Sequence, residues 1–344
     1  MSSVDTTAES HDDHHDDHHD HGEFIAHHFD SAEQQFDSGK LGIWVFLVTE
    51  VLFFSGLFVA YTLYRYHHPE VFVDASRFLD KILGGLNTIV LLFSSLTMAW
   101  AVRAAQLGQN KFAGKLILIT MVCAAMFLGV KAVEYSHKWD LHILPISYYN
   151  QIEGYHPEPA EGGIAGALHI SPWLVKLSIV PAIFLGLFAA ACGFFAATGK
   201  KVLAVFSLGL VIMMSGFFIG AVIGQVYQNW HESTLAAHDG EHGHGHGAAG
   251  HGDDHGAHDD HGPDEDTSGR KPQIGVFFSI YYCMTGLHAI HVIAGMIALS
   301  WLYLRCLKAH FRPDYFGPVD YVGLYWHLVD LIWIYLFPLL YLIK

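Results

Sequence analysis

Hydrophobic residues in this chain are gathered into long blocks separated by polar stretches. The blocks are too continuous for the one-sided stripe of a surface helix, and none alternates apolar and polar residues as a lipid-facing barrel strand would. A helix crosses a bilayer core with about 20 apolar residues. Seven blocks reach that length: 42–64, 85–105, 114–135, 173–197, 202–227, 274–304 and 321–343. The pattern predicts an all-α polytopic membrane protein with seven transmembrane helices.

Polar tails and loops separate these blocks. Segments such as "HDDHHDDHHDHG" consist of residues that cannot bury a core, so we expect the His/Asp-rich segments to be disordered. The predicted parts are an acidic His-rich tail (1–40), three helices (41–136), an outer loop (137–172), a helix pair (173–227), an acidic His-rich outer loop (228–273) and two final helices (274–344).

Composition agrees with a membrane protein and shows where the charge lies. Of 344 residues, 52% are hydrophobic, and the formal net charge is −15 with histidine neutral. Residues 1–37 hold eleven acidic residues and residues 238–266 hold nine, with no Lys or Arg in either segment. The rest of the chain is therefore mildly basic. We expect contacts with membrane lipids and no nucleic-acid partner.

Basic residues between the blocks indicate the orientation. If the N-terminus lies inside, then Lys111, Lys115, Lys200, Lys201 and Arg305 fall in short inner loops, as the positive-inside rule requires. We therefore expect a cytoplasmic N-terminus, with the two long loops outside. The four cysteines lie in or beside the blocks, and we expect no disulfide between them.

Ionisable side chains within the predicted spans are the main functional candidates. Each costs a few kcal/mol or more in a bilayer unless it faces protein, forms a pair or lines a pathway. They are Glu50 and three pairs, Lys131 with Glu134, His288 with His291, and His327 with Asp330. Each pair is three residues apart, which places both side chains on one helical face. We expect Lys131 to pair with Glu134, and the face of His288 and His291 to contact His327 and Asp330.

The two pairs that contain histidine allow two interpretations. Imidazole and carboxylate groups on two helices can form a metal site. However, the Glu-x-x-His pattern of di-iron bundles does not recur here. Interhelical hydrogen bonding, at about 1 kcal/mol per contact, is the favoured interpretation. We also interpret Asn87 as a helix–helix contact.

Glu50 has no basic residue within a helical turn. It must therefore carry a proton or reach a partner on another helix or subunit. A structural hydrogen bond and a proton-linked role both stay open from the residues alone.

The His-rich stretch 238–262 also has two interpretations. Such tracts can bind Cu or Zn weakly, but the irregular spacing here does not resemble a closed zinc site. We favour a solvating segment whose charge changes as its histidines titrate near neutral pH.

Several stretches together resemble subunit III of the haem-copper oxidases. They include "GIWVFLVTEVLFFSGLFVAY", "NTIVLLFSSLTMAWAVRAAQLG", "FLGVKAVEY", "TGLHAIHV" and "YWHLVDLIWI", in the family's order. The resemblance covers roughly 130 residues over five helices. It implies a subunit without haem or copper that packs on catalytic subunit I of a bacterial oxidase, supports its proton uptake, prolongs its activity and holds phospholipids near the oxygen route.

The resemblance also implies roles for individual residues. The family's intramembrane glutamates match Glu50 and Glu134, so Glu50, Glu134 and Lys131 are expected to be proton-linked or intramembrane polar groups. Packing or lipid contact is expected for the remaining candidates, which are Asn87, His288, His291, Trp326, His327 and Asp330. No catalytic residue and no metal ligand is implied. Haems and copper are expected in partner subunits, and subunit II or other respiratory subunits are further expected partners.

The chain differs from the family in two places, before its first three helices and directly after them. The helix pair that opens seven-helix members is absent, and spans 173–197 and 202–227 are inserted before the last two helices. We expect the inserted pair either to occupy the space of the missing one or to contact another subunit. The electron donor is not indicated, so a cytochrome c oxidase, a quinol oxidase and a nitric-oxide-reductase-associated protein stay open. A metal transporter is the alternative from another class.

Overall fold

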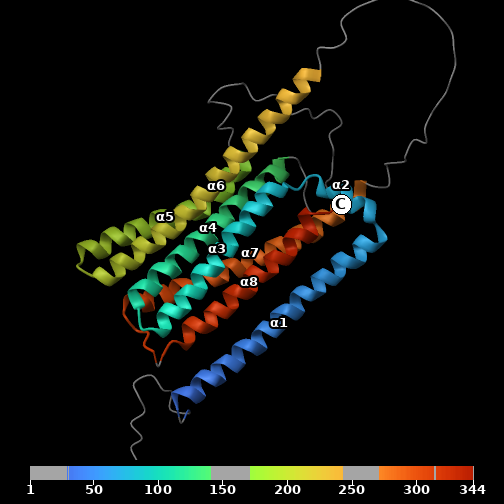
Figure 1. The fold of residues 1–344 in the computed structure, drawn as a ribbon. Coiled ribbons are helices and arrows are strands. Elements are labelled where there is room, and N and C mark those ends of the chain that lie inside the picture. Colours follow the sequence, from blue (N-terminus) through green and yellow to red (C-terminus); the bar gives the residue numbers. More distant parts are fainter. Residues whose placement is uncertain (1–28, 30, 141–170, 243–270, 314, 344) are drawn as a thin grey trace, which may run out of the picture.

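The computed structural model describes residue 29 and residues 31–140, 171–242, 271–313 and 315–343 (Figure 1). Its helices are α1 (Ala32–His67), α2 (Pro69–Ser76), α3 (Lys81–Gln106), α4 (Asn110–Asp140), α5 (Pro172–Ala197), α6 (Lys201–His242), α7 (Lys271–Leu307) and α8 (Gly317–Tyr341). Among the described residues, seven of these helices are long and apolar enough to cross a membrane, and no strand is present. The all-α polytopic prediction is confirmed.

The helices extend beyond the predicted blocks. Residues 32–40, predicted as tail, belong to α1, and α6 continues through residues 228–242, predicted as loop. The sequence "QVYQNWHESTLAAH" contains neither Gly nor Pro and includes several good helix formers, which accounts for the longer α6. The rest of the predicted tail, most of the loop 137–172 and residues 243–270 lie outside the described residues.

Local sequence accounts for the ends of the helices. The Asp80 side chain caps α3 by accepting hydrogen bonds from the backbone N–H groups of Ile82 and Leu83 at 2.9 and 3.1 Å. Gly108 and Gly199 have φ values of 70° and 73°, in the left-handed region that glycine adopts readily. They lie in the short turns from α3 to α4 and from α5 to α6, and so make two tight antiparallel hairpins.

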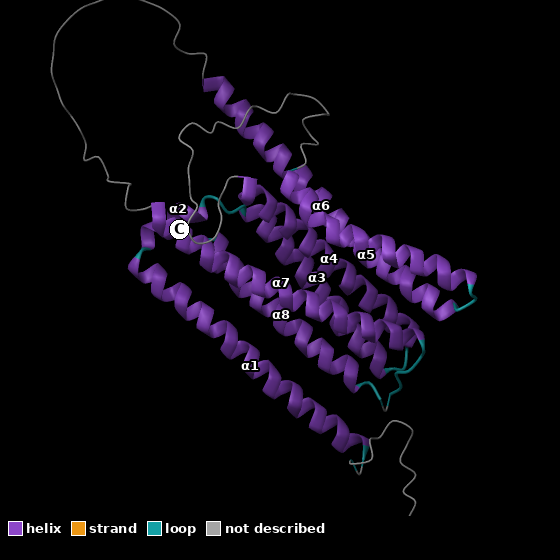
Figure 2. Cartoon of the chain, turned by 180° about the vertical axis from the view of Figure 1, so that it is seen from behind, coloured by secondary structure: helices purple, strands orange, loops and turns teal. Residues whose placement is uncertain are grey.

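Helices α3, α4, α7 and α8 form the centre of the bundle. α4 is the most buried span and packs against α3, α6 and α7, while α8 packs against α3 and α7. α1 lies along one side and the α5–α6 hairpin along the other, as the two opposite views show (Figures 1 and 2). The central four helices therefore carry the interior in which polar candidates are buried.

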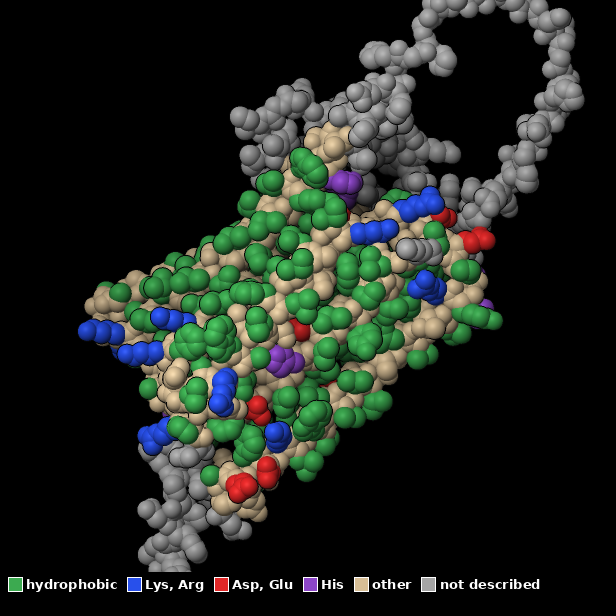
Figure 3. Space-filling model, viewed as in Figure 1, with side chains coloured by type: hydrophobic (Ala, Val, Ile, Leu, Met, Phe, Trp, Pro, Cys, Tyr) green, Lys and Arg blue, Asp and Glu red, His purple; other side chains and the backbone are tan. Residues whose placement is uncertain are grey.

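Apolar side chains cover the outer surface. Figure 3 shows them spread over the middle of one face, with Lys and Arg gathered toward its two ends. On α1, Trp44, Leu52 and Val59 are more than half exposed, and Ile183 and Phe194 are similarly exposed on α5. A soluble monomer does not expose apolar surface on this scale. The surface is that of a multi-pass membrane protein.

A row of glycines joins the α5–α6 hairpin to the central bundle. Gly216, Gly220 and Gly224 recur every four residues on the face of α6 that contacts α4. A Cβ atom on Gly220 would overlap the Met126 carbonyl oxygen, and one on Gly216 would lie 2.7 Å from the Val122 carbonyl oxygen. Small residues at this spacing let two membrane helices approach closely and gain van der Waals contact. The hairpin is therefore an integral part of the bundle.

Candidate functional site

A fully buried ionic cluster lies on α4. Lys131, Glu134 and Lys138 are at most 4% exposed and share one helical face. The Lys131 Nζ atom lies 2.7 Å from Glu134 Oε2, and the Lys138 Nζ atom lies 2.7 Å from Glu134 Oε1. Asp80 of α3 is an electrostatic neighbour of Lys138. The two ammonium groups therefore share the Glu134 carboxylate, with Asp80 as a further acidic neighbour.

Tyrosines from two other helices complete the environment of Glu134. The hydroxyls of Tyr281 on α7 and Tyr341 on α8 donate to Glu134 Oε1 at 2.8 and 2.6 Å. With the two lysines, the carboxylate accepts four hydrogen bonds from α4, α7 and α8. A buried ion pair is tolerated in a membrane only when its remaining polar atoms are satisfied in this way. The cluster thus joins α4, α7 and α8 at one end of the bundle.

The sequence predicted part of this cluster. The expected Lys131–Glu134 pair is present, but Lys138 and the two tyrosines were missed. Lys138 is four residues after Glu134, a spacing that could have revealed it, but it lies just beyond the apolar block. The tyrosine hydroxyls carry no such pattern, because their contact depends on how three helices pack.

Glu50 finds its partner on α7. Its Oε2 atom lies 2.9 Å from His291 Nε2, and His291 Nδ1 lies 2.8 Å from the Leu287 carbonyl oxygen. A carbonyl oxygen can only accept, so Nδ1 must be the donor there. The Glu50 contact then needs one more proton, carried either by Nε2 or by the carboxyl group. Glu50 and His291 therefore share one proton between α1 and α7.

His288 has different surroundings from His291, although both were predicted to meet one neighbour. Its ring is fully buried between Phe127 on α4 and Trp333 on α8, with ring centroids 5.5 and 5.3 Å away. Neither of its ring nitrogens has a hydrogen-bond partner among the described residues. Aromatic packing is the contact that the structure gives this side chain.

The Trp-His-x-x-Asp element of α8 faces α3. Trp326 Nε1 donates to the Ser94 hydroxyl at 3.2 Å, and His327 Nδ1 lies 2.6 Å from Ser95 Oγ. Asp330 is buried close to these two hydroxyls, although neither of its oxygens meets hydrogen-bond geometry with a described residue. The prediction that His327 and Asp330 meet the face of His288 and His291 is therefore wrong. Three-residue spacing identifies a shared face, but not the neighbouring helix.

Asn87 lies in the centre of the bundle on α3. It is fully buried, and its amide has no hydrogen-bond partner among the described residues. The next residue, Thr88, accepts a hydrogen bond of 3.1 Å from Trp333 Nε1 on α8. The role of Asn87 as a helix–helix contact stays a prediction.

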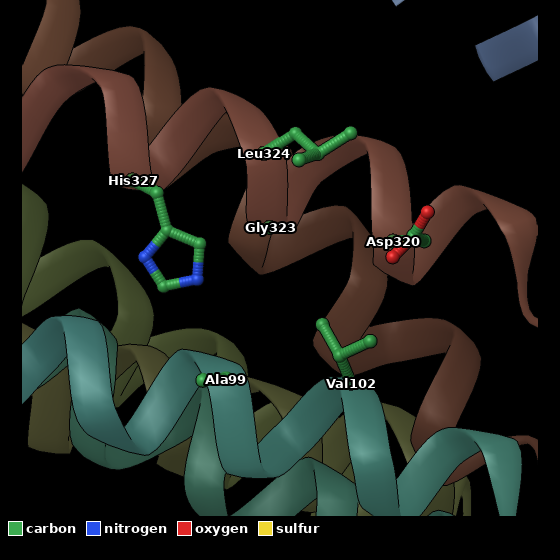
Figure 4. A pocket seen from close by; sticks show the side chains of 6 residues that line it. All are labelled: Ala99, Val102, Asp320, Gly323, Leu324 and His327. Atoms are coloured by element: carbon green, nitrogen blue, oxygen red, sulfur yellow. The ribbon is translucent and has the colours of Figure 1, made fainter.

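A cavity of about 190 Å³ opens between α3 and α8. Figure 4 shows the His327 ring projecting from α8 toward α3 across this space. The lining residues are Ala99, Val102, Asp320, Gly323, Leu324 and His327.

Candidate metal ligands are not gathered in the part of the chain that the structure describes. No group of three or more His, Cys, Asp or Glu side chains there could hold a metal ion. His291 contacts Glu50 and His327 contacts Ser95, so the two predicted histidine pairs do not converge. The side chains of the His-rich stretch 238–262 lie outside the described residues.

These features define a helical, multi-pass membrane protein with several ionisable groups buried among its helices. The chain matches the family model described as cytochrome c oxidase subunit III over residues 13–141 and 273–344, more than half of its length. It belongs to that family. All the polar contacts described above lie within the matched residues, whereas α5 and α6 lie outside them.

Individual relatives share shorter segments. The chain is 40% identical over 76 residues to cytochrome c oxidase subunit 3 of Corynebacterium diphtheriae, covering 22% of this chain and 37% of the relative. It is 39% identical over 66 residues to probable cytochrome c oxidase subunit 3 of Nocardia farcinica, covering 19% and 32%. It is 37% identical over 70 residues to heme-copper oxidase subunit I+III of Aeropyrum pernix, covering 20% and 9%. The match thus spans about a third of the two bacterial subunits.

Proposed function

We propose that this chain is a non-catalytic subunit III of a bacterial terminal haem-copper oxidase, a respiratory complex that reduces dioxygen and pumps protons. The observation that carries the proposal is the family match, which covers every helix that holds an intramembrane ionisable group described above. The complex lies in the plasma membrane, with the N-terminus of this chain in the cytoplasm.

Subunit I is the proposed main partner. The name of the Aeropyrum pernix relative joins subunits I and III in one protein, which supports their association. The apolar face of α1, which includes Trp44 and Leu52, offers surface for a membrane partner or for lipid. In this position the chain stabilises subunit I, supports proton uptake and holds phospholipids near the oxygen route. Subunit II and other respiratory subunits complete the assembly.

The haems and copper of the complex belong to its partner subunits in this proposal. The chemistry of the intramembrane donors in this chain supports that assignment. Glu134 already accepts four hydrogen bonds, His291 is engaged on both ring nitrogens, and His288 packs between aromatic rings. Glu50, Glu134 and Lys131 are therefore proposed as proton-linked or structural groups.

Purification of the native complex through this chain tests the proposal. We expect subunit I and a visible haem spectrum to accompany it. A copper-binding subunit II in the same preparation favours cytochrome c as the electron donor, and its replacement by a quinol-binding partner favours a quinol oxidase. A preparation that contains neither haem nor subunit I would contradict the proposal.

A metal transporter is the competing function because of the seven spans and the His-rich segments. It requires several carboxylate–histidine sites along one path, whereas the described part of the chain brings one such pair into contact, Glu50 with His291. Uptake of radioactive zinc into vesicles that contain this chain alone separates the two functions. We expect no uptake above that of empty vesicles.

A further inference from the structure

Asp330 is the buried ionisable group that the contacts above do not explain. Its side chain is 2% exposed near the middle of α8, and both carboxyl oxygens lack a hydrogen bond within the described ranges. No lysine, arginine or histidine forms an ion pair with it among the described residues. An ionised carboxylate in this position would cost several kcal/mol.

The neighbours of Asp330 are polar but uncharged. Ser94 and Ser95 of α3 place their hydroxyls close to the carboxyl group, and Cys123 of α4 is an electrostatic neighbour. On α7, His291 is engaged by Glu50, and His288 packs between aromatic rings. On α4, Lys131 is held by Glu134. Hydroxyl groups suit a protonated acid, or an acid that exchanges its proton with water.

The cavity between α3 and α8 reaches His327, which lies one helical turn before Asp330 on α8. Asp320, in the first turn of α8, lies at one end of its lining, and His327 lies two turns further along the helix (Figure 4). The space depends on Gly323, because a Cβ atom there would lie 3.0 Å from Val102 Cγ2. A cavity of about 190 Å³ with two polar lining residues is large enough to hold water.

His327 connects the cavity with Ser95. Its ring lines the cavity, its Nδ1 atom lies 2.6 Å from Ser95 Oγ, and Ser95 is in turn a close neighbour of the buried Asp330. An imidazole can accept a proton on one nitrogen while releasing one from the other. A hydroxyl can likewise accept one proton while donating its own. The three side chains thus form an ordered series from the cavity to the buried acid.

We infer that Asp330 is a proton-holding site inside the bundle, which exchanges its proton with water in the α3–α8 cavity through His327 and Ser95. On protonation, a hydronium ion in the cavity gives a proton to His327 Nε2 and remains as water, and the Nδ1 proton passes to Ser95 Oγ. The Ser95 hydroxyl, which lies close to Asp330 without being hydrogen-bonded to it, then turns toward the carboxylate and passes its original proton to it. The reverse order releases the proton, so no oxidant or further reactant is needed.

Infrared spectroscopy of the complex purified through this chain tests the inference, whatever its haem content. We expect an absorption band of a protonated carboxyl group that disappears in Asp330→Asn and shifts to lower frequency after transfer into D₂O. If that variant fails to assemble, labelling the wild type with ¹³C-aspartate identifies the band. The absence of the band, or a band that does not shift in D₂O, would overturn the inference.

Two further variants test the route. Ala99→Leu places a larger side chain at the exposed edge of the cavity, and Ser95→Ala removes the hydroxyl that links His327 to Asp330. We expect both to slow the shift in D₂O, whereas Ala189→Leu on the exposed face of α5 leaves its rate unchanged. A wild-type rate in both cavity variants would show that the proton reaches Asp330 by another path.

Discussion

His291 on α7 and Glu50 on α1 approach within 2.9 Å, and the contact requires them to share one proton. α1 is among the least buried spans of the bundle. Both side chains are largely covered, at 17% and 18% exposed, so their contact helps to hold α1 against α7.

Replacing Glu50 should have a different effect from replacing His291. In Glu50→Gln, the amide can donate to His291 Nε2, so we expect the complex to assemble while the pH dependence of its activity changes. In His291→Leu, Glu50 loses its hydrogen-bond partner, and we expect the free energy of unfolding to fall by about 1–3 kcal/mol. Retention of the subunit in detergent measures the change in stability. Activity as a function of pH measures the proton-linked change. Failure of Glu50→Gln to assemble would show that the charge itself is structural.

The ionic cluster on α4 should depend most strongly on its central carboxylate. Glu134→Gln leaves Lys131 and Lys138 without their carboxylate. We expect the free energy of unfolding to fall by about 3–5 kcal/mol. Lys138→Met leaves the Lys131–Glu134 pair and both tyrosine contacts in place, so its effect should be smaller. Thermal denaturation of the complex gives the order of the two losses. An equal effect of both substitutions would contradict the central role of Glu134.

The glycine row on α6 should tolerate no larger side chain. Gly220→Leu drives a side chain into the backbone of α4, and overpacking of this kind costs about 1–3 kcal/mol or more. Gly186→Leu on α5 is the matched control, because nothing lies within 4 Å of a Cβ atom there. Cysteine cross-linking between α4 and α6 reports whether the hairpin separates. Unchanged cross-linking and stability in Gly220→Leu would argue against close backbone packing.

The contact between Trp326 and Ser94 should appear as a coupled pair. Trp326→Phe leaves the Ser94 hydroxyl without its donor, and Ser94→Ala leaves the indole N–H unpaired inside the bundle. We expect each substitution to lower the free energy of unfolding by about 1–3 kcal/mol. The double variant should lower it by less than the sum of the two. Thermal denaturation of the four proteins of the cycle provides the measurement. Strict additivity would mean that the hydrogen bond contributes nothing to stability.

The sequence predicted correctly those features that depend on a single helix. The seven spans follow from block length, and the Lys131–Glu134 pair follows from its three-residue spacing. Gly216, Gly220 and Gly224 also recur at a spacing typical of close helix contacts, which could have indicated the α4–α6 interface. These features need no knowledge of the neighbouring helices.

Contacts between helices were harder to predict. Residues three apart on a helix differ by about 60° in direction, enough for His288 to reach Phe127 while His291 reaches Glu50. The prediction of the partner of His327 was wrong for a related reason, because α8 packs against both α3 and α7. The local pattern does not say which neighbour a given side chain meets. A partner for Glu50 on another helix was one of two open alternatives, and only the packing identified it.

Because α6 approaches α4 closely, changes on one of these helices should be accompanied by changes on the other during evolution. A shortened chain without α5 and α6 would expose to lipid a strip of α4 shaped around Gly129, whose surface now lies against the Phe217 backbone. Loss of the hairpin would then require larger residues on α4, and a larger residue at Gly220 would require a smaller neighbour there. Although α5 and α6 lie outside the family match, their history should be recorded in paired changes on a helix that lies within it.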